Sequence, residues 1–192
     1  MRGRAMRVTK LTLLALLCAA LVAGAGCGGG EGAEPTPTPS PIPSGIFEIY
    51  LVNTSNMSQV NFSDLDSIPL QDEPILSATD IIAYYWDDRQ SGRHDIELTD
   101  EGCRYFWGEV AKTDTVYCSF IVIVNGERIY RGAFWPMYSS LYPVNPSIWY
   151  LPPGGCNYSS GITIYGGTSD RTDLLYDSRI YSALKQAGIL IE

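Results

Sequence analysis

His94 is the only histidine of this chain and therefore its first candidate for acid–base chemistry. Asp88 and Asp95 lie close to it in the sequence, and a carboxylate beside an imidazole is suited to proton transfer. No Gly-x-Ser-x-Gly nucleophile motif is present, so a serine triad would have to use this one histidine. A histidine that starts a strand beside a polar turn is more often solvated. We therefore predict no catalytic residue, with an unfamiliar hydrolase centred on His94 as the alternative.

Carboxylates that could hold a metal ion gather in one stretch, at Asp64, Asp66, Asp72 and Glu73. Their spacing fits no calcium loop and lacks the glycine that an EF-hand requires. One histidine also excludes any ligand set with two imidazoles. We expect a solvated acidic surface here, and we predict no metal and no cofactor.

Three cysteines fall in the second half of the chain, at Cys103, Cys118 and Cys156. Their spacing is unlike that of a zinc site. Outside the cytoplasm, two of them could form a disulfide and leave the third free, and the sequence does not say which two.

The N-terminus has the layout of a secretory signal. Arg2, Arg4, Arg7 and Lys10 precede an apolar run at 11–23, and the small residues 24–26 lead directly into Cys27. A cysteine at this point resembles the signal of bacterial lipoproteins, although that family usually has Leu where this chain has Gly24. The resemblance implies removal of residues 1–26, acyl chains on Cys27, and anchoring on the extracytoplasmic side of the cell membrane.

Two other interpretations of this N-terminus are open. An uncleaved membrane helix is the weaker one, because the apolar run has 13 residues and a span needs about 20. A secretory signal without lipid is the stronger competitor. Cys18 does not fit the lipidated position, since the bulky Leu16 and Leu17 precede it.

Residues 27–44 form a Gly- and Pro-rich linker between the anchor and a folded domain at 45–192. Proline alternates with small residues from Pro35 to Pro43, which favours an extended polyproline II spacer. At ~3.1 Å per residue, the stretch from Gly28 to Ser44 reaches about 50 Å from the bilayer. A proline-rich ligand for an aromatic groove is the alternative.

Four of the 13 basic residues precede Cys27, so the rest of the chain carries 9 basic and 21 acidic residues, a net charge of −12. A charge of this sign repels phosphate backbones and argues against a nucleic-acid partner. The partners that remain are the lipid bilayer, through Cys27, and proteins or peptides of the cell envelope.

The domain alternates strand and helix signals. Strands are predicted at 46–52, 94–99, 119–124, 128–134, 148–151 and 162–165, with a helical turn that runs into a strand over 78–86. Thr99 is suited to cap one helix, and Asp177 or Ser178 can cap a last helix that ends at Gly188. Asn125-Gly126 predicts a tight hairpin. The fold class is α+β, with one mostly antiparallel sheet and two helices packed on one face.

This order of elements resembles the first large extracytoplasmic domain of SecD, a subunit of the protein-export translocon. The matching stretches are Glu73–Ser77, Asp80–Ile81, Glu97–Gly102 with Phe106, the hairpin Ile121–Ile129, Gly161–Ile162 and Ala183–Leu190. The resemblance implies a shared fold and a tendency to contact extended polypeptide. It implies no catalytic machinery, and the stretch from Trp135 to Pro143 has no counterpart in that domain.

Aromatic residues crowd a segment that is rich in Pro and Ser: Trp135, Tyr138, Tyr142, Trp149 and Tyr150. Exposed Trp and Tyr favour contacts with protein, peptide or sugar, because they offer a large rigid area with a polar tip. The competing interpretation is that they merely cover the open side of the sheet. We predict a lipoprotein with a non-catalytic binding or assembly domain, with a purely structural surface protein as a further possibility.

Overall fold

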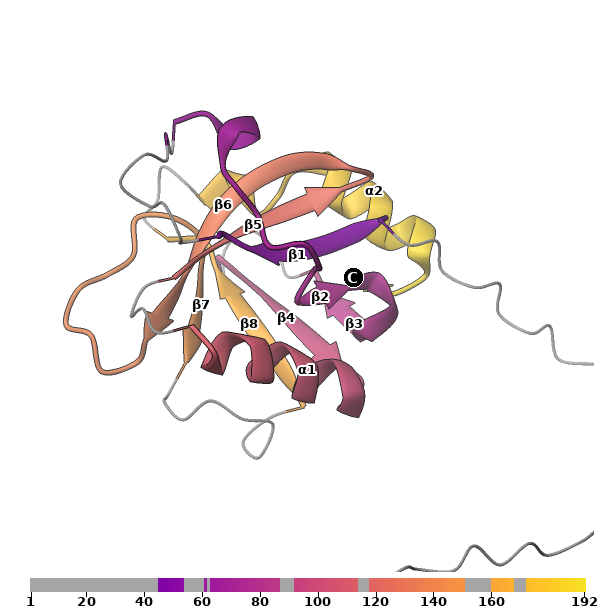
Figure 1. Ribbon diagram of the computed structural model, residues 1–192. Helices are drawn as coiled ribbons and strands as arrows, with labels where there is room; N and C mark the ends of the chain where they lie inside the picture. The colour runs from indigo at the N-terminus through magenta and orange to yellow at the C-terminus, as the bar shows by residue number, and fades with distance from the viewer. Residues whose placement is uncertain are drawn as a thin grey trace, which may run out of the picture. The chain divides into compact units, whose positions relative to one another are not determined.

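The computed structural model describes residues 45–53, 61, 63–86, 92–113, 118–150, 160–167 and 172–192. The predicted signal and linker, together with Asp88 and Cys156, lie outside these residues. Within them, nine strands form one curled sheet in the order β2-β1-β5-β6-β7-β8-β4-β3-β9 (Figure 1). The strands are β1 (Phe47–Leu51), β2 (Leu76–Ser77), β3 (Ile81–Tyr85), β4 (Arg93–Leu98), β5 (Ser119–Val124), β6 (Glu127–Pro136), β7 (Ser147–Tyr150), β8 (Gly161–Tyr165) and β9 (Leu190–Ile191).

The sheet is mixed but mostly antiparallel. Two neighbouring pairs, β3–β9 and β6–β7, are parallel, and the other six are antiparallel. Two helices, α1 (Asp100–Ala111) and α2 (Ser178–Ala187), pack on the same face of this sheet, which we call the inner face. The predicted α+β class is confirmed.

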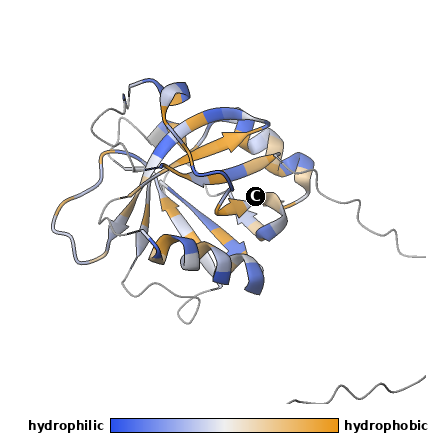
Figure 2. Ribbon diagram, viewed as in Figure 1, coloured by the Kyte–Doolittle hydropathy of each residue, from blue (hydrophilic) through white to orange (hydrophobic). Residues whose placement is uncertain are grey.

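One hydrophobic core joins the inner face of the sheet to both helices. Phe106 and Val110 from α1 and Ile180 and Leu184 from α2 belong to the same buried cluster as Phe120 of β5. Apolar residues also run along β1 and β5 in Figure 2. The three- and four-residue spacing of these helical side chains places them on one stripe, as the sequence predicts.

Local signals set the ends of both helices. The Thr99 hydroxyl accepts a hydrogen bond from the Gly102 N–H at 3.0 Å, and Asp177 caps α2 by accepting from the Arg179 N–H at 2.9 Å. Gly188 ends α2 in the left-handed conformation, with φ of 72°. Each of these ends lies where the sequence predicts it.

The hairpin between β5 and β6 is also as predicted. Asn125 and Gly126 both have positive φ, at 50° and 80°, which suits the right-handed twist of the two strands. β6 continues to Pro136, two residues beyond the predicted strand, and its last four residues pair with β7.

The outer face of the sheet, opposite the helices, is only partly covered. Over β1 and β5, the segment around the short helix η2 (Leu65–Ser67) forms a second small core with Ile121 and Ile123. Arg128 fixes this segment by donating to the carbonyl oxygens of Leu65 and Ile68. No helix among the described residues has the length and apolarity to cross a membrane.

Candidate functional site

Aromatic side chains lie together on the outer face of β6, β7 and β8. Trp135 and Trp149 are register partners in the parallel pair β6–β7. Tyr165 of β8 lies beside them, with its ring centroid 5.4 Å from that of Trp149. Because side chains on one face of neighbouring strands stand close together, these three rings form a continuous row across the sheet.

A loop from the end of β6 adds a fourth ring. Tyr142 lies 6.5 Å from Trp149, centroid to centroid, and its side chain is 81% exposed. We call Trp135, Tyr142, Trp149 and Tyr165 the aromatic face. The indole N–H of Trp135 donates to the Leu141 carbonyl at 2.9 Å, so the loop is held against this face.

The structure brings together three of the five predicted surface residues: Trp135, Tyr142 and Trp149. Tyr138 is exposed in the same loop. Tyr150 lies on the opposite side of β7, where it packs against the main core. Tyr165 belongs to the aromatic face although the sequence did not single it out; the alternation of β8 places it opposite Ser147, on the same face as Trp149.

Charged side chains border the aromatic face on β4. Arg93 is the register partner of Tyr165, and its guanidinium lies 3.4 Å from the carboxylate of Asp95. Asp95 in turn accepts a hydrogen bond from the Thr163 hydroxyl at 2.5 Å. An aromatic centre beside a charged border has the composition of a protein-binding surface, in which Tyr, Trp and Arg are enriched.

His94 has a structural role that the sequence did not predict. Its side chain is fully buried on the inner face, with Nδ1 2.9 Å from the Tyr84 hydroxyl. Rings of Trp86 and Tyr176 pack at 4.5 Å and 4.9 Å from it. The expectation of a solvated strand-starting histidine is therefore wrong, and the imidazole does not reach the surface where a substrate would meet it.

Burial also governs the chemistry of Tyr84, whose pKa lies well above its ordinary value because the desolvated ring disfavours a phenolate. The hydroxyl therefore stays protonated as a partner for His94. This pair lies on the inner face of the sheet, opposite the outer face that carries the aromatic residues.

The acidic stretch forms no ion-binding cluster within the described part of the chain. Asp64 caps η2 by accepting from the Asp66 N–H at 3.2 Å, and Asp66, Asp72 and Glu73 are exposed to solvent. Among the described residues, no group of three or more His, Cys, Asp or Glu side chains could share a metal ion.

The two described cysteines of the domain differ in state. Cys103 of α1 is disulfide-bonded to a cysteine outside the described residues, whereas Cys118 is a free, buried thiol. Burial raises the pKa of the Cys118 thiol, which disfavours the reactive thiolate. Cys118 thus has the features of a core residue.

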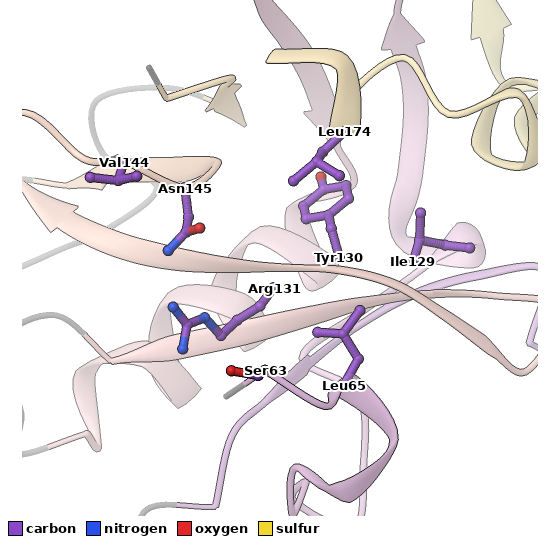
Figure 3. A pocket seen from close by; sticks show the side chains of 8 residues that line it. All are labelled: Ser63, Leu65, Ile129, Tyr130, Arg131, Val144, Asn145 and Leu174. Atoms are coloured by element: carbon purple, nitrogen blue, oxygen red, sulfur yellow. The ribbon is translucent and has the colours of Figure 1, made fainter. Parts of the chain in front are cut away.

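A cavity of about 560 Å³ lies beside β6 (Figure 3). In this view Tyr130 and Leu174 lie on one side of the strand, and Arg131, Ser63 and Leu65 lie on the other. The cavity thus borders both faces of the sheet. Its described lining brings no nucleophile together with a base.

The Tyr130 hydroxyl next to this cavity is buried and has no hydrogen-bond partner within the described residues. Tyr130→Phe is therefore expected to raise the free energy of unfolding by about 1 kcal/mol, because an unsatisfied buried hydroxyl is removed while the ring is kept. Urea denaturation of both proteins measures the change. A loss of stability would mean that the hydroxyl has a partner outside the described part of the chain.

No protein-family model and no curated protein matches this chain. Among solved structures, the crystal structure of SecDF in its super-membrane-facing form matches with a TM-score of 0.38 and 18% sequence identity. The match covers 72% of this chain and 18% of that chain, so this chain spans about a fifth of the length of that protein. The likeness is weak, and it concerns only the arrangement of strands and helices.

Proposed function

We propose that this protein is a lipid-anchored, extracytoplasmic binding module that contacts polypeptide through the aromatic face and catalyses no reaction. The observation that carries this proposal is the row of Trp135, Trp149 and Tyr165 across three strands, extended by the exposed Tyr142. Large rigid rings of this kind supply contact area at a low cost in conformational entropy, which is why they dominate protein interfaces.

The anchoring part of the proposal rests on the signal-like N-terminus that ends at Cys27. The disulfide of Cys103 supports the same location, since disulfides persist in oxidising compartments outside the cytoplasm. The net charge of −12 after Cys27 supports a protein partner over a nucleic acid.

The absence of catalysis is supported by the position of His94. A general acid or base must come within hydrogen-bond distance of the substrate. The imidazole of His94 is instead enclosed by Tyr84, Trp86 and Tyr176. A hydrolase that used this residue would have to open the core of the domain.

Cross-linking in intact cells tests the binding surface. A photoreactive benzoylphenylalanine at position 142 is expected to form adducts with polypeptide, identified by mass spectrometry. The matched control places the same group at Tyr105, a tyrosine of α1 that is also exposed. Equal adducts at both positions, or none at position 142, would contradict the proposal.

For a partner identified in this way, Tyr142→Ala is expected to weaken binding about tenfold or more, because truncation of a central aromatic residue at an interface costs of the order of 2 kcal/mol. Isothermal titration calorimetry provides the measurement. Tyr105→Ala is expected to leave the affinity unchanged. Tyr142 is highly exposed, so its substitution leaves the core intact.

A further inference from the structure

Exposed apolar side chains concentrate in one short loop. The described residues contain nine large hydrophobic side chains that are strongly exposed, and five of them lie between positions 137 and 144. They are Met137, Tyr138, Leu141, Tyr142 and Val144, with exposed fractions from 56% to 81%. A concentration of exposed apolar side chains in one segment is a feature of surfaces that interact with a protein or a membrane.

Hydrogen bonds fix the shape of this loop. The Met137 N–H donates to the Tyr150 carbonyl at 2.9 Å, and the Ser139 N–H donates to the Pro136 carbonyl at 3.0 Å. The Trp135 indole holds the Leu141 carbonyl, as described above. The apolar side chains are therefore displayed by an ordered backbone that projects from the sheet, on the side of Figure 1 opposite the start of β1.

The loop lies in the middle of a long stretch without charge. No Asp, Glu, Lys, Arg or His occurs from Gly132 to Ser169, although the chain beyond Cys27 carries a net charge of −12. Most of this acidic protein is repelled by anionic headgroups, and the uncharged stretch escapes that repulsion. Tyr beside Leu, Met and Val is also the composition that favours the boundary between headgroups and acyl chains.

We propose that the loop 137–144 is a membrane-contact element that inserts Met137, Leu141 and Val144 into the surface of a phospholipid bilayer, whereas Tyr142, whose ring lies 6.5 Å from that of Trp149, belongs to the aromatic face. A projecting loop fits a soft bilayer surface, whereas the aromatic face on the strands fits polypeptide. The proposal rests on the lipid anchor at Cys27, which keeps the loop at a high local concentration near the bilayer. An extended linker over residues 27–44 reaches about 50 Å, which allows the loop to approach the bilayer.

The test uses the full-length acylated protein in vesicles of phosphatidylcholine and phosphatidylglycerol in equal amounts. Leu141→Cys carries an environment-sensitive NBD label, and Cys118 does not compete for the label because it is buried. In the vesicles, NBD emission is expected to shift to shorter wavelength, to be quenched by spin-labelled lipid and to lose its quenching by iodide. Met137→Cys with the same label provides a second, independent position, since Met137 is also exposed in this loop.

Ile82→Cys is the matched control, since Ile82 is a strongly exposed apolar residue of β3 outside this loop. Its label is expected to stay accessible to iodide. Labels at positions 137 and 141 that remain aqueous, or a response at position 82 equal to theirs, would overturn the proposal. Flotation of the vesicles separates the two hypotheses. If the protein floats while the loop labels remain in water, the anchor is supported and the insertion is contradicted. If the protein does not float, the anchor itself is contradicted.

Discussion

Gly132→Ala is expected to lower the free energy of unfolding by about 3 kcal/mol, as overpacking of a rigid core does. A Cβ atom at Gly132 would lie within 2.6 Å of three ring atoms of Phe120, its register partner on β5. The Phe120 ring cannot swing aside, because it is fully buried and packs edge-on against Phe134 at 5.3 Å. Because Gly132 has no side chain, the Phe120 ring has room to lie over it.

Thermal unfolding by circular dichroism measures the effect, with an expected fall in Tm of roughly 6 to 10 °C for a domain of this size. Gly108→Ala is the matched control. Gly108 lies on the exposed side of α1 with nothing within 4 Å of the added carbon. The same substitution there is expected to raise stability by up to about 1 kcal/mol, because alanine is a better helix former than glycine.

A double-mutant cycle with Phe120→Leu identifies the cause. A smaller side chain at position 120 makes room for the new methyl group, so the double variant is expected to lose less stability than the two single variants together. Additive losses would show that the clash with the ring is not the reason. Gly132 lies inside a strand that the sequence predicts. The requirement for a residue without a side chain at this position is visible only when the register of β5 and β6 is known.

Much of the fold follows from local signals, and these are what the sequence predicts well. Thr99, the Asn125-Gly126 turn and Gly188 each act on backbone atoms a few residues away, so the chain specifies these features without knowledge of distant partners. The short strands β2 and β9 have two residues each and carry no such signal. They exist because β1 and β3 offer unpaired edges, and their assignment requires the tertiary structure.

The aromatic face shows the same division between local and distant information. Composition alone points to Trp135, Tyr138, Tyr142, Trp149 and Tyr150 as a group, since a segment rich in Pro and Ser is not expected to be mostly core. Composition does not distinguish Trp149 from Tyr150, which are neighbours in sequence but lie on opposite faces of β7. Only the register with β6 and β8 assigns each ring to a face, because a shift by one residue would exchange them.

A signal for the burial of His94 is present in its own strand. The period-two alternation of β4 places His94 on the same face as Ile96 and Leu98, and this face is the buried one. The residues that enclose it, Trp86 and Tyr176, come from the end of β3 and from the segment before α2. A single histidine suggests a catalytic role. The packing of aromatic rings from distant parts of the chain shows instead that it is buried.

Cys27→Ala is expected to abolish acylation of this protein completely. The variant is expected to be released from the membrane or to be mislocalised. If the cysteine sulfur and the new N-terminus carry two or more acyl chains, the anchor is stable, whereas a single chain gives only marginal binding. Growth with an alkyne-bearing fatty acid followed by fluorescent coupling measures acylation, and cell fractionation measures location. The wild-type protein is expected to carry the label and to sediment with membranes.

Cys18→Ala is the matched control, because it removes a cysteine from the apolar run of the same signal. Leu16 and Leu17 precede it, where a lipidated cysteine would follow small residues, so this variant is expected to keep both label and location. An unlabelled wild-type protein, or Cys27→Ala that still incorporates the fatty acid, would refute the lipid anchor. Intact-mass analysis of the wild-type protein adds a direct criterion. Its first residue is expected to be Cys27 with acyl chains. An unmodified N-terminus at Met1 would indicate a cytoplasmic protein, a location that does not suit the acidic domain, its disulfide or its uncharged loop.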